Sequence, residues 1–505
     1  MTKSFSFKLY SLRGVIGTFV LWGLLQSLVR LLSGTVLSGD DAKENIFTQS
    51  WDWGYLPDNP PLYEWLLHAS QIIFGPTLFS FLFLKYALLT LSGVFVFLTA
   101  RRVLRDEKWA ALSSFGLVLL YQIGWNYFQA LSHSALAFTL ITALLYAGTR
   151  LVEYQRLVDY LWFGLALGLG LLSKYNSAGL AVSLLAAGLI LPQTRKVFLN
   201  WRILVSFALA GLLLAPHLFW VADHWQAASA MVSDSLGLAK DSHAERALNG
   251  VGSGLVAILS FFLPFLLVAT LLFRKGLGRR WRPKGDERLE LVKWLGLAGL
   301  FGGALMLFGA VVLGVPEISE RYAIPFLFPL WFWLMARMRS VASQKTEKAY
   351  FAALGGFALF VLLFRMGTGI IAEPFCKKCM DFVPYDAVIE AAREKIDGPV
   401  TLFVMEENTA GNIRRAFPDA QTVWLNLSPI YYPVIEARPC LMIWSEQMAG
   451  GPMPPIIRDE TNSDNTISVT GKWKHLYKDE WRETEWFITT LDESARTYRQ
   501  FCAPR

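Results

Sequence analysis

The dominant feature of this sequence is a succession of apolar segments, each about long enough to cross a lipid bilayer. A spanning helix needs roughly 20 mostly apolar residues, and its backbone polar groups must be paired internally because no water is present. We expect about eleven such helices in the first 371 residues. The predicted spans lie near residues 12–34, 77–100, 109–123, 131–149, 159–172, 177–192, 203–220, 251–273, 291–313, 322–336 and 350–371.

The composition fits a chain whose surface faces lipid. Hydrophobic residues make up 54% of the sequence and charged residues only 17%, whereas a soluble protein carries roughly 25% charged residues. The net charge of +7 would be compatible with nucleic-acid binding, but the basic residues lie in short loops between the apolar segments. The pattern therefore indicates a protein that contacts membrane lipid and not nucleic acid.

Lysine and arginine are concentrated in alternate loops. One set of loops begins with the N-terminus and carries most of these residues. Because basic loops are retained in the cytoplasm, we expect the N-terminus inside and the segment after the last span outside. The other set of loops carries only Lys43, Lys174, Lys240, Arg246 and Arg321.

The segment 372–505 is expected to form a small extracytoplasmic α/β domain. Apolar and polar residues alternate in its "PVTLFVMEEN", "QTVWLNLS" and "CLMIWSE" stretches, which is typical of strands. The predicted fold is thus mostly α, with a polytopic transmembrane helical bundle over 1–371 followed by this domain. Its main outer loops are 35–76 and 221–250.

The four cysteines, Cys376, Cys379, Cys440 and Cys502, all lie in this last segment. An oxidising compartment outside the cytoplasm favours disulfide bonds, and four cysteines allow three sets of pairings. Cys376 and Cys379 also form a CxxC, for which a zinc half-site or a redox pair is the alternative.

The first outer loop combines an acidic pair with aromatic residues. Asp40 and Asp41 follow directly on the first span, so we expect them at or just above the extracytoplasmic interface. Paired carboxylates there suit a general base for an acceptor hydroxyl, or cation binding. The alternative is a solvated acidic loop, although Trp51, Trp53 and Tyr55 favour amphipathic helices on the membrane surface.

Three further motifs resemble those of one family of membrane enzymes. An acidic-X-Pro-Pro-Leu run at 58–62 follows the acidic pair, "SKYN" at 173–176 ends a span on the outer side, and "ERYAIPFLFPLWFW" resembles an Arg-Tyr-x-x-Pro-x-x-Pro segment. Their order is similar to that in the GT-C glycosyltransferases of the protein-mannosyltransferase and lipid A aminoarabinose-transferase type, over most of residues 10–340. "LSKYN" and "APHLFWVADH" look most like bacterial transferases that add uronic acid or related sugars to lipopolysaccharide.

This resemblance implies an inverting transfer from a polyprenyl-phosphate-linked sugar to lipopolysaccharide, lipid A or another envelope glycan. The protein would lie in a bacterial inner membrane with its C-terminal domain in the periplasm. By position, Asp40 matches the family's catalytic aspartate and would accept the proton of the attacking hydroxyl. Asp41 is a second candidate acid, with surface solvation as its alternative.

Lys174, Arg321 and Tyr322 are the candidate ligands for the donor phosphate. A cation in an otherwise apolar region can hold a phosphate and neutralise its charge as it leaves. For Lys174 the alternative is a side chain that snorkels to the interface. For Arg321 the alternative is an ion pair with Glu317 or Glu320.

Asp58, Asn59 and His133 are candidate substrate contacts. Asn59 stands where the aminoarabinose transferases carry lysine, and His133 stands where relatives often carry an acid. A hydrogen-bonded packing histidine is the alternative for His133. Asp58 and His224 match residues that hold a metal in the aminoarabinose enzymes. Since catalytic zinc normally has three protein ligands, a divalent metal is one hypothesis for this pair and ordinary loop polarity is the other.

Two other classes of function are compatible with a membrane bundle. A transporter or flippase for a lipid-linked sugar predicts charges near the bilayer midplane, broken spans and repeated halves, and the sequence shows no matching halves. A non-catalytic assembly or receptor protein would use the tail as a binding module. We expect an enzyme, a glycosyltransferase that depends on a polyprenyl-phosphate sugar.

Overall fold

Two compact units make up the chain. The first consists of residues 1–24, 57–62 and 85–361, and the second of residues 25–56, 63–84 and 362–505. Most of the first outer loop therefore belongs to the same unit as the C-terminal segment. The computed structural model describes residues 9–128, 131–235, 242–277, 288–371, 382–425, 436–446, 465–474 and 481–504.

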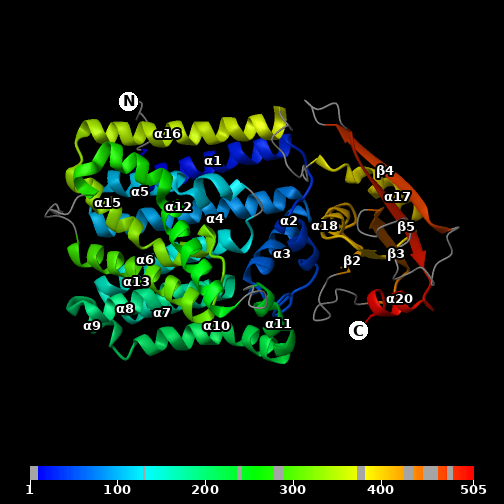
Figure 1. Ribbon diagram of the computed structural model, residues 1–505, viewed down its shortest axis with the longest axis horizontal. Helices are drawn as coiled ribbons and strands as arrows, with labels where there is room; N and C mark the ends of the chain where they lie inside the picture. Colours follow the sequence, from blue (N-terminus) through cyan, green and yellow to red (C-terminus); the bar gives the residue numbers. More distant parts are fainter. Residues whose placement is uncertain are drawn as a thin grey trace, which may run out of the picture. The chain divides into compact units, whose positions relative to one another are not determined.

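Long apolar helices that run side by side form the membrane bundle (Figure 1). In the described part of the chain, seven helices are long and apolar enough to cross a membrane. Two shorter apolar helices, α7 (Leu157–Ser173) and α8 (Ser177–Ile190), pack against the long ones. The seven are α1 (Leu12–Leu32), α4 (Leu78–Leu104), α6 (His133–Tyr154), α10 (Ile203–Asp223), α12 (His243–Leu277), α13 (Leu289–Leu313) and α16 (Gln344–Met366), which continues into a π turn, η4 (Gly367–Ile371).

Two of the predicted spans are interrupted. The span predicted at 109–123 begins as α5 (Glu107–Phe115) and continues in two short turns. The span predicted at 322–336 is divided into α14 (Glu320–Leu327) and α15 (Leu330–Val341). Pro329 precedes α15 and has no N–H to donate to the turn before it. The mostly helical membrane fold is confirmed, whereas the number of eleven spans stays a prediction. The remaining short elements are η1 (Gly116–Leu119), η2 (Tyr121–Trp125), η3 (Asn126–Phe128), α9 (Pro192–Phe198) and α11 (Trp225–Ser235).

Close helix packing in the bundle depends on small residues and on internally paired polar groups. At Gly164 on α7, a Cβ atom would lie 2.5 Å from the carbonyl oxygen of Ser206 on α10, so only glycine allows this approach. The hydroxyl of Ser206 donates to the carbonyl oxygen of Tyr160 (2.7 Å), and the indole of Trp294 donates to that of Leu184 (3.0 Å). Lipid offers such groups no partners, so pairing inside the protein stabilises the bundle.

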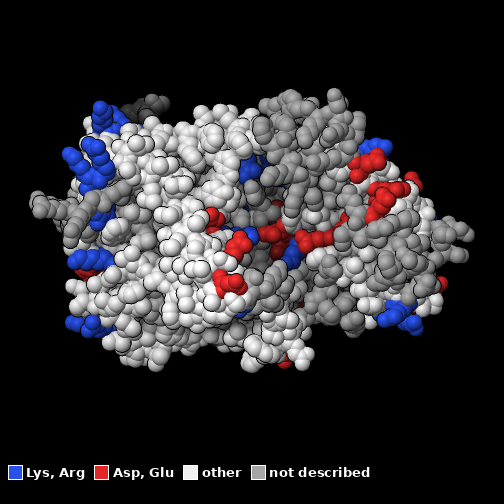
Figure 2. Space-filling view, viewed as in Figure 1, with Lys and Arg blue, Asp and Glu red and all other residues white. Residues whose placement is uncertain are grey.

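Ion pairs join several of the loops that are predicted to be cytoplasmic. Glu153 contacts Arg102 at 2.5 Å and Arg288 at 2.7 Å, and Asp159 contacts Arg150 at 2.9 Å. Figure 2 shows lysine and arginine side chains gathered at the left-hand end of the bundle. The charge separation along the bundle agrees with the positive-inside pattern, and the orientation in the membrane stays a prediction.

A five-stranded sheet with helices on both faces forms the described part of the C-terminal segment, which confirms the predicted small α/β domain. The strand order is β2-β1-β3-β5-β4. β1 pairs in parallel with β2 and β3, and β5 pairs antiparallel with β3 and β4. The elements are α17 (Tyr385–Lys395), β1 (Thr401–Val404), α18 (Glu407–Ala416), β2 (Gln421–Trp424), β3 (Cys440–Ser445), β4 (Ile467–Lys474), β5 (Trp481–Leu491) and α20 (Arg496–Phe501).

Successive residues of the strands point to opposite faces, which gives this domain two apolar cores. Leu402 and Val404 of β1 pack with α17 and α18, whereas Phe403 packs on the other face with α20. There the ring of Phe403 stacks on that of Phe501 with 4.5 Å between centroids. Ile46 of the first outer loop is fully buried in the core formed with α17 and α18.

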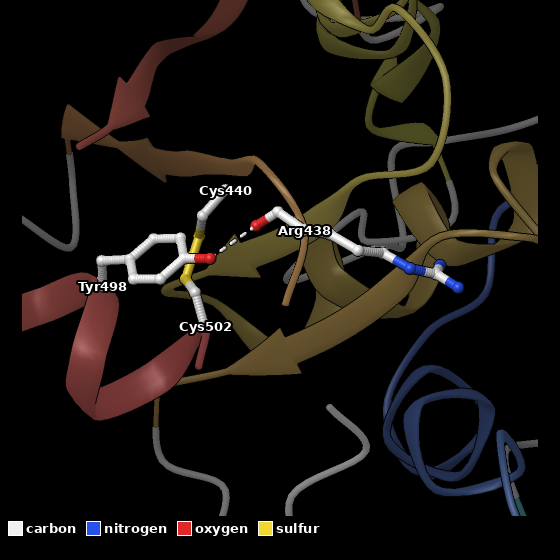
Figure 3. Close-up of a disulfide and its surroundings, with 4 residues drawn as sticks. All are labelled: Arg438, Cys440, Tyr498 and Cys502. Atoms are coloured by element: carbon white, nitrogen blue, oxygen red, sulfur yellow. Dashed lines mark hydrogen bonds between the residues drawn. A yellow bond between two sulfur atoms is a disulfide. The ribbon is translucent and has the colours of Figure 1, made fainter. Parts of the chain in front are cut away.

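A disulfide bond joins Cys440, at the start of β3, to Cys502, just after α20 (Figure 3). Beside it, the hydroxyl of Tyr498 donates to the carbonyl oxygen of Arg438 (2.9 Å). The predicted disulfide chemistry is confirmed for this pair. Cys376 and Cys379 lie outside the described residues.

Removing the disulfide should destabilise the C-terminal domain. Replacing both Cys440 and Cys502 with serine should lower its free energy of unfolding by roughly 2–4 kcal/mol, because the bond restricts the unfolded chain between them. Denaturation of the full chain in detergent, followed by proteolysis of the tail, measures the difference. A reductant should lower the unfolding free energy of the wild type more than that of the double variant. Equal unfolding free energies for the two proteins would contradict this account.

Candidate active site

The first group of candidate residues lies on α2 (Asp40–Phe47) in the second unit. Asp40 is the first residue of this helix and is half-buried, whereas Asp41 is only 8% exposed and Glu44 only 4% exposed. A second short helix, α3 (Leu62–Phe74), follows in the same loop. The loop is thus helical, as predicted, and Asp41 is not part of a solvated acidic surface.

Glu407, the first residue of α18, adds a further acid to this group. The pKa of Glu407 is raised, chiefly because burial penalises its charged form and also because the carboxylates of Asp40 and Glu44 are near. The ammonium group of Lys43 acts in the opposite direction. The C-terminal domain therefore contributes a carboxyl group to the surroundings of Asp40.

The second group of candidate residues lines one pocket in the first unit. Its polar residues are Ser134 at the start of α6, Lys174 and Asn176 in the turn between α7 and α8, and Arg321 on α14. The structure brings Lys174 and Arg321 together, although they lie far apart in the sequence. The apolar lining consists of Ala137, Phe138, Ile141, Ile324 and Pro325.

Both cations also approach one aromatic ring. The Nζ atom of Lys174 donates to the hydroxyl of Ser134 (2.9 Å) and lies 5.2 Å from the ring centroid of Tyr322. The guanidinium carbon of Arg321 lies 5.9 Å from the same centroid. A ring face attracts cations, so Tyr322 helps to hold the two charges on one side of the bundle.

The alternatives for these cations fit the structure less well. Lys174 is partly buried against Ser134 and Tyr322, whereas a snorkelling lysine would extend into water. Glu320 accepts a hydrogen bond from Ser260 (2.9 Å). Within the described residues, Arg321 forms no ion pair with Glu317 or Glu320.

Sequence reasoning missed Ser134 and Asn176 as pocket residues. The side-chain oxygen Oδ1 of Asn176 is buried and accepts no hydrogen bond within the described structure. It is a suitable group for a sugar hydroxyl, because a buried acceptor without a partner is costly. The "SKYN" stretch held a signal for Asn176, whereas no motif distinguishes Ser134 from other serines.

The remaining candidates lie on separate elements. Asp58 and Asn59 are half-buried in the turn before α3, and His133 is buried at the start of α6, next to Ser134 of the pocket. His224 ends α10, where its Nδ1 atom lies 2.7 Å from the carbonyl oxygen of Trp220 and its ring stacks on the indole. Contacts of Asp58, Asn59 and His133 with a substrate stay predictions.

A metal site at Asp58 and His224 stays a prediction. Among the described residues, neither one belongs to a cluster of three or more carboxylate, histidine or cysteine side chains. Since catalytic zinc normally has three protein ligands, these two residues fit a metal ion poorly, and no step of the reaction is assigned to one.

The family model described as dolichyl-phosphate-mannose-protein mannosyltransferase matches residues 58–220. Two curated relatives from Rhizobium johnstonii are the lipopolysaccharide core galacturonosyltransferases RgtB and RgtA, each 28% identical to this chain. The RgtB match covers 86% of this chain and 87% of that protein. The RgtA match covers 83% and 84%.

Two solved structures of ArnT from Cupriavidus metallidurans are similar to this chain. The structure bound to undecaprenyl phosphate has a TM-score of 0.58 at 13% identity and covers 95% of this chain and 99% of that one. The apo structure has a TM-score of 0.59 at 10% identity and covers 95% and 98%. At such low identity the likeness shows the fold, a membrane bundle with a small C-terminal domain.

Proposed function

We propose that the chain is an integral-membrane glycosyltransferase of the GT-C type that transfers galacturonic acid from a polyprenyl-phosphate donor to the lipopolysaccharide core. The names of the two curated relatives support the sugar and the acceptor. The ArnT structure that contains undecaprenyl phosphate supports the lipid. The donor tail would lie in the bilayer and its sugar at the periplasmic face.

The observation that carries this proposal is the shared pocket of Lys174 and Arg321. A leaving phosphate gains negative charge in the transition state, and fixed cations stabilise that charge more strongly in an apolar surrounding than in water. The guanidinium of Arg321 suits bidentate contact with phosphate oxygens, and Lys174 supplies a point charge. Asn176 would accept a hydrogen bond from the sugar.

Asp40 is the proposed general base. It takes the proton from the acceptor hydroxyl while the hydroxyl oxygen forms a bond to the anomeric carbon. The bond from that carbon to the phosphate oxygen breaks, and its electron pair leaves on the polyprenyl phosphate. Attack opposite the leaving group inverts the anomeric configuration. Asp58, Asn59 and His133 are proposed to contact the sugar, and Asp41 is the second candidate acid after Asp40.

The proposed reaction predicts which side of the membrane each part of the chain faces. We place the N-terminus and the loops rich in lysine and arginine in the cytoplasm, because basic loops are retained on that side of the membrane. Residues 1–371 form the membrane domain, and residues 372–505 form the periplasmic domain. Asp40, which follows α1 on the predicted outer side, then matches an acceptor that arrives from the periplasm.

Comparison of envelope glycolipids with and without the protein tests this function. Mass analysis should show a lipopolysaccharide core that lacks one hexuronic acid when the protein is absent, and purified protein should restore the sugar from a polyprenyl-phosphate donor. The alternative, a flippase for the lipid-linked sugar, predicts movement of donor across liposomes with no transfer by purified protein. That second result would overturn the proposal.

A further inference from the structure

Helix α18 of the C-terminal domain holds the helix that begins with Asp40. The two helices pack directly against each other within the second unit. At Gly411 on α18, a Cβ atom would lie 2.3 Å from the carbonyl oxygen of Ala42 on α2, so the backbones meet without an intervening side chain. Ile46 of α2 is fully buried in the core of the domain. This part of the first outer loop is therefore built into the C-terminal domain.

Arg414 is the centre of this contact. It is 5% exposed, and its guanidinium donates to the carbonyl oxygen of Asn45, the carbonyl oxygen of Thr48 (2.7 Å) and the side-chain oxygen of Gln71 (3.1 Å). It also contacts the side-chain oxygens of Asn45 (3.0 Å) and Thr48 (3.2 Å). One side chain thus ties the end of α2 to α3.

Asn412 fixes the other end of the loop. Its side chain accepts a hydrogen bond from the backbone N–H of Leu37 and donates to the carbonyl oxygen of the same residue, both at 2.8 Å. Asn408 accepts from the N–H of Gly39 (3.2 Å), the residue before Asp40. The chain is held immediately before Asp40 and again at the end of its helix.

We propose that Arg414 is a positioning residue for catalysis, which acts by fixing the orientation of α2 and hence of the Asp40 carboxylate. This inference rests on the proposed role of Asp40 as general base. A base must lie within hydrogen-bond reach of the proton that it removes. A mutation far from the reacting atoms that displaces a catalytic group by about 1 Å costs up to about 100-fold in rate. Buried, charge-assisted hydrogen bonds provide the necessary rigidity.

The test compares Arg414→Ala with Arg438→Gln in the purified full-length protein. Arg438 belongs to the same domain and contacts Asp419 and Glu436 instead of α2. For Arg414→Ala we expect kcat to fall by about 10- to 100-fold with little change in the donor KM, and added guanidinium ion should restore part of the rate. Arg438→Gln should retain the wild-type kcat.

The same assay separates this inference from the proposed function. If Asp40→Asn alone retains full activity, the base is wrongly assigned. If Asp40→Asn is inactive but folded Arg414→Ala has the wild-type kcat, the positioning role is wrong. The Asp40→Asn, Arg414→Ala double variant should be no slower than Asp40→Asn, since both changes act on one group. If Arg414→Ala does not fold, Asn412→Ala carries the test, and a wild-type kcat for that variant overturns the inference.

Discussion

Replacing Asp40 with asparagine should reduce kcat for sugar transfer by about 100- to 10,000-fold, the range in which a general base contributes to catalysis. The side chain keeps its size but can no longer accept the proton of the acceptor hydroxyl. Donor binding should change little, because the phosphate is held by other residues. Initial rates with purified protein, a polyprenyl-phosphate donor and lipopolysaccharide core measure the effect.

Asp52→Asn is the matched control for this prediction. Asp52 lies in the same loop and accepts a hydrogen bond from the hydroxyl of Ser50 (2.5 Å), a contact that an amide oxygen can keep. Its kcat should stay near the wild-type value. A similar loss in both variants would point to disruption of the loop, and full activity of Asp40→Asn would exclude Asp40 as the base.

Removal of either pocket cation should also have a large effect. Lys174→Gln and Arg321→Gln should each lower kcat/KM by about 100- to 1,000-fold, as loss of one fixed group that stabilises transition-state charge commonly does. The pocket then faces the leaving phosphate with one cation instead of two. Arg321→Lys should recover only part of the loss, because an ammonium cannot form the bidentate contact of a guanidinium.

Lys345→Gln provides the control for a lost positive charge. Lys345 is exposed at the start of α16, in a segment that is predicted to be cytoplasmic. Loss of its positive charge should therefore leave the rate of sugar transfer unchanged. Binding of polyprenyl phosphate to each variant separates donor affinity from chemistry. Wild-type kcat/KM for both pocket variants would show that the phosphate is bound elsewhere.

The features that sequence alone predicted well are those with a short-range signal. Apolar segments of spanning length and alternate basic loops predict a membrane bundle, because lipid constrains every residue of a span. Lys174 and Arg321 were recognisable because each is a cation beside an apolar segment at the outer end of a predicted span. The structure brings both to one pocket, whereas their convergence with Asp40 stays a prediction because Asp40 belongs to the other unit.

The contacts that join distant segments could not be predicted. Arg414 and Glu407 lie near α2 in the structure, although most of the chain separates them from α2 in the sequence. A single sequence contains no signal for such pairs. In the sequence, Ile46 is one apolar residue among others in an outer loop. Only the structure shows that it is buried in the core of the C-terminal domain. The prediction of one continuous span around Pro329 was wrong. The segment is apolar throughout, but the chain forms two helices there.

The most direct test of the account is an experimental structure of the protein with polyprenyl phosphate bound. The phosphate should lie within roughly 3 Å of the Lys174 ammonium and the Arg321 guanidinium, at ordinary hydrogen-bond distance. A phosphate that is bound away from both cations would show that the pocket is not the donor site.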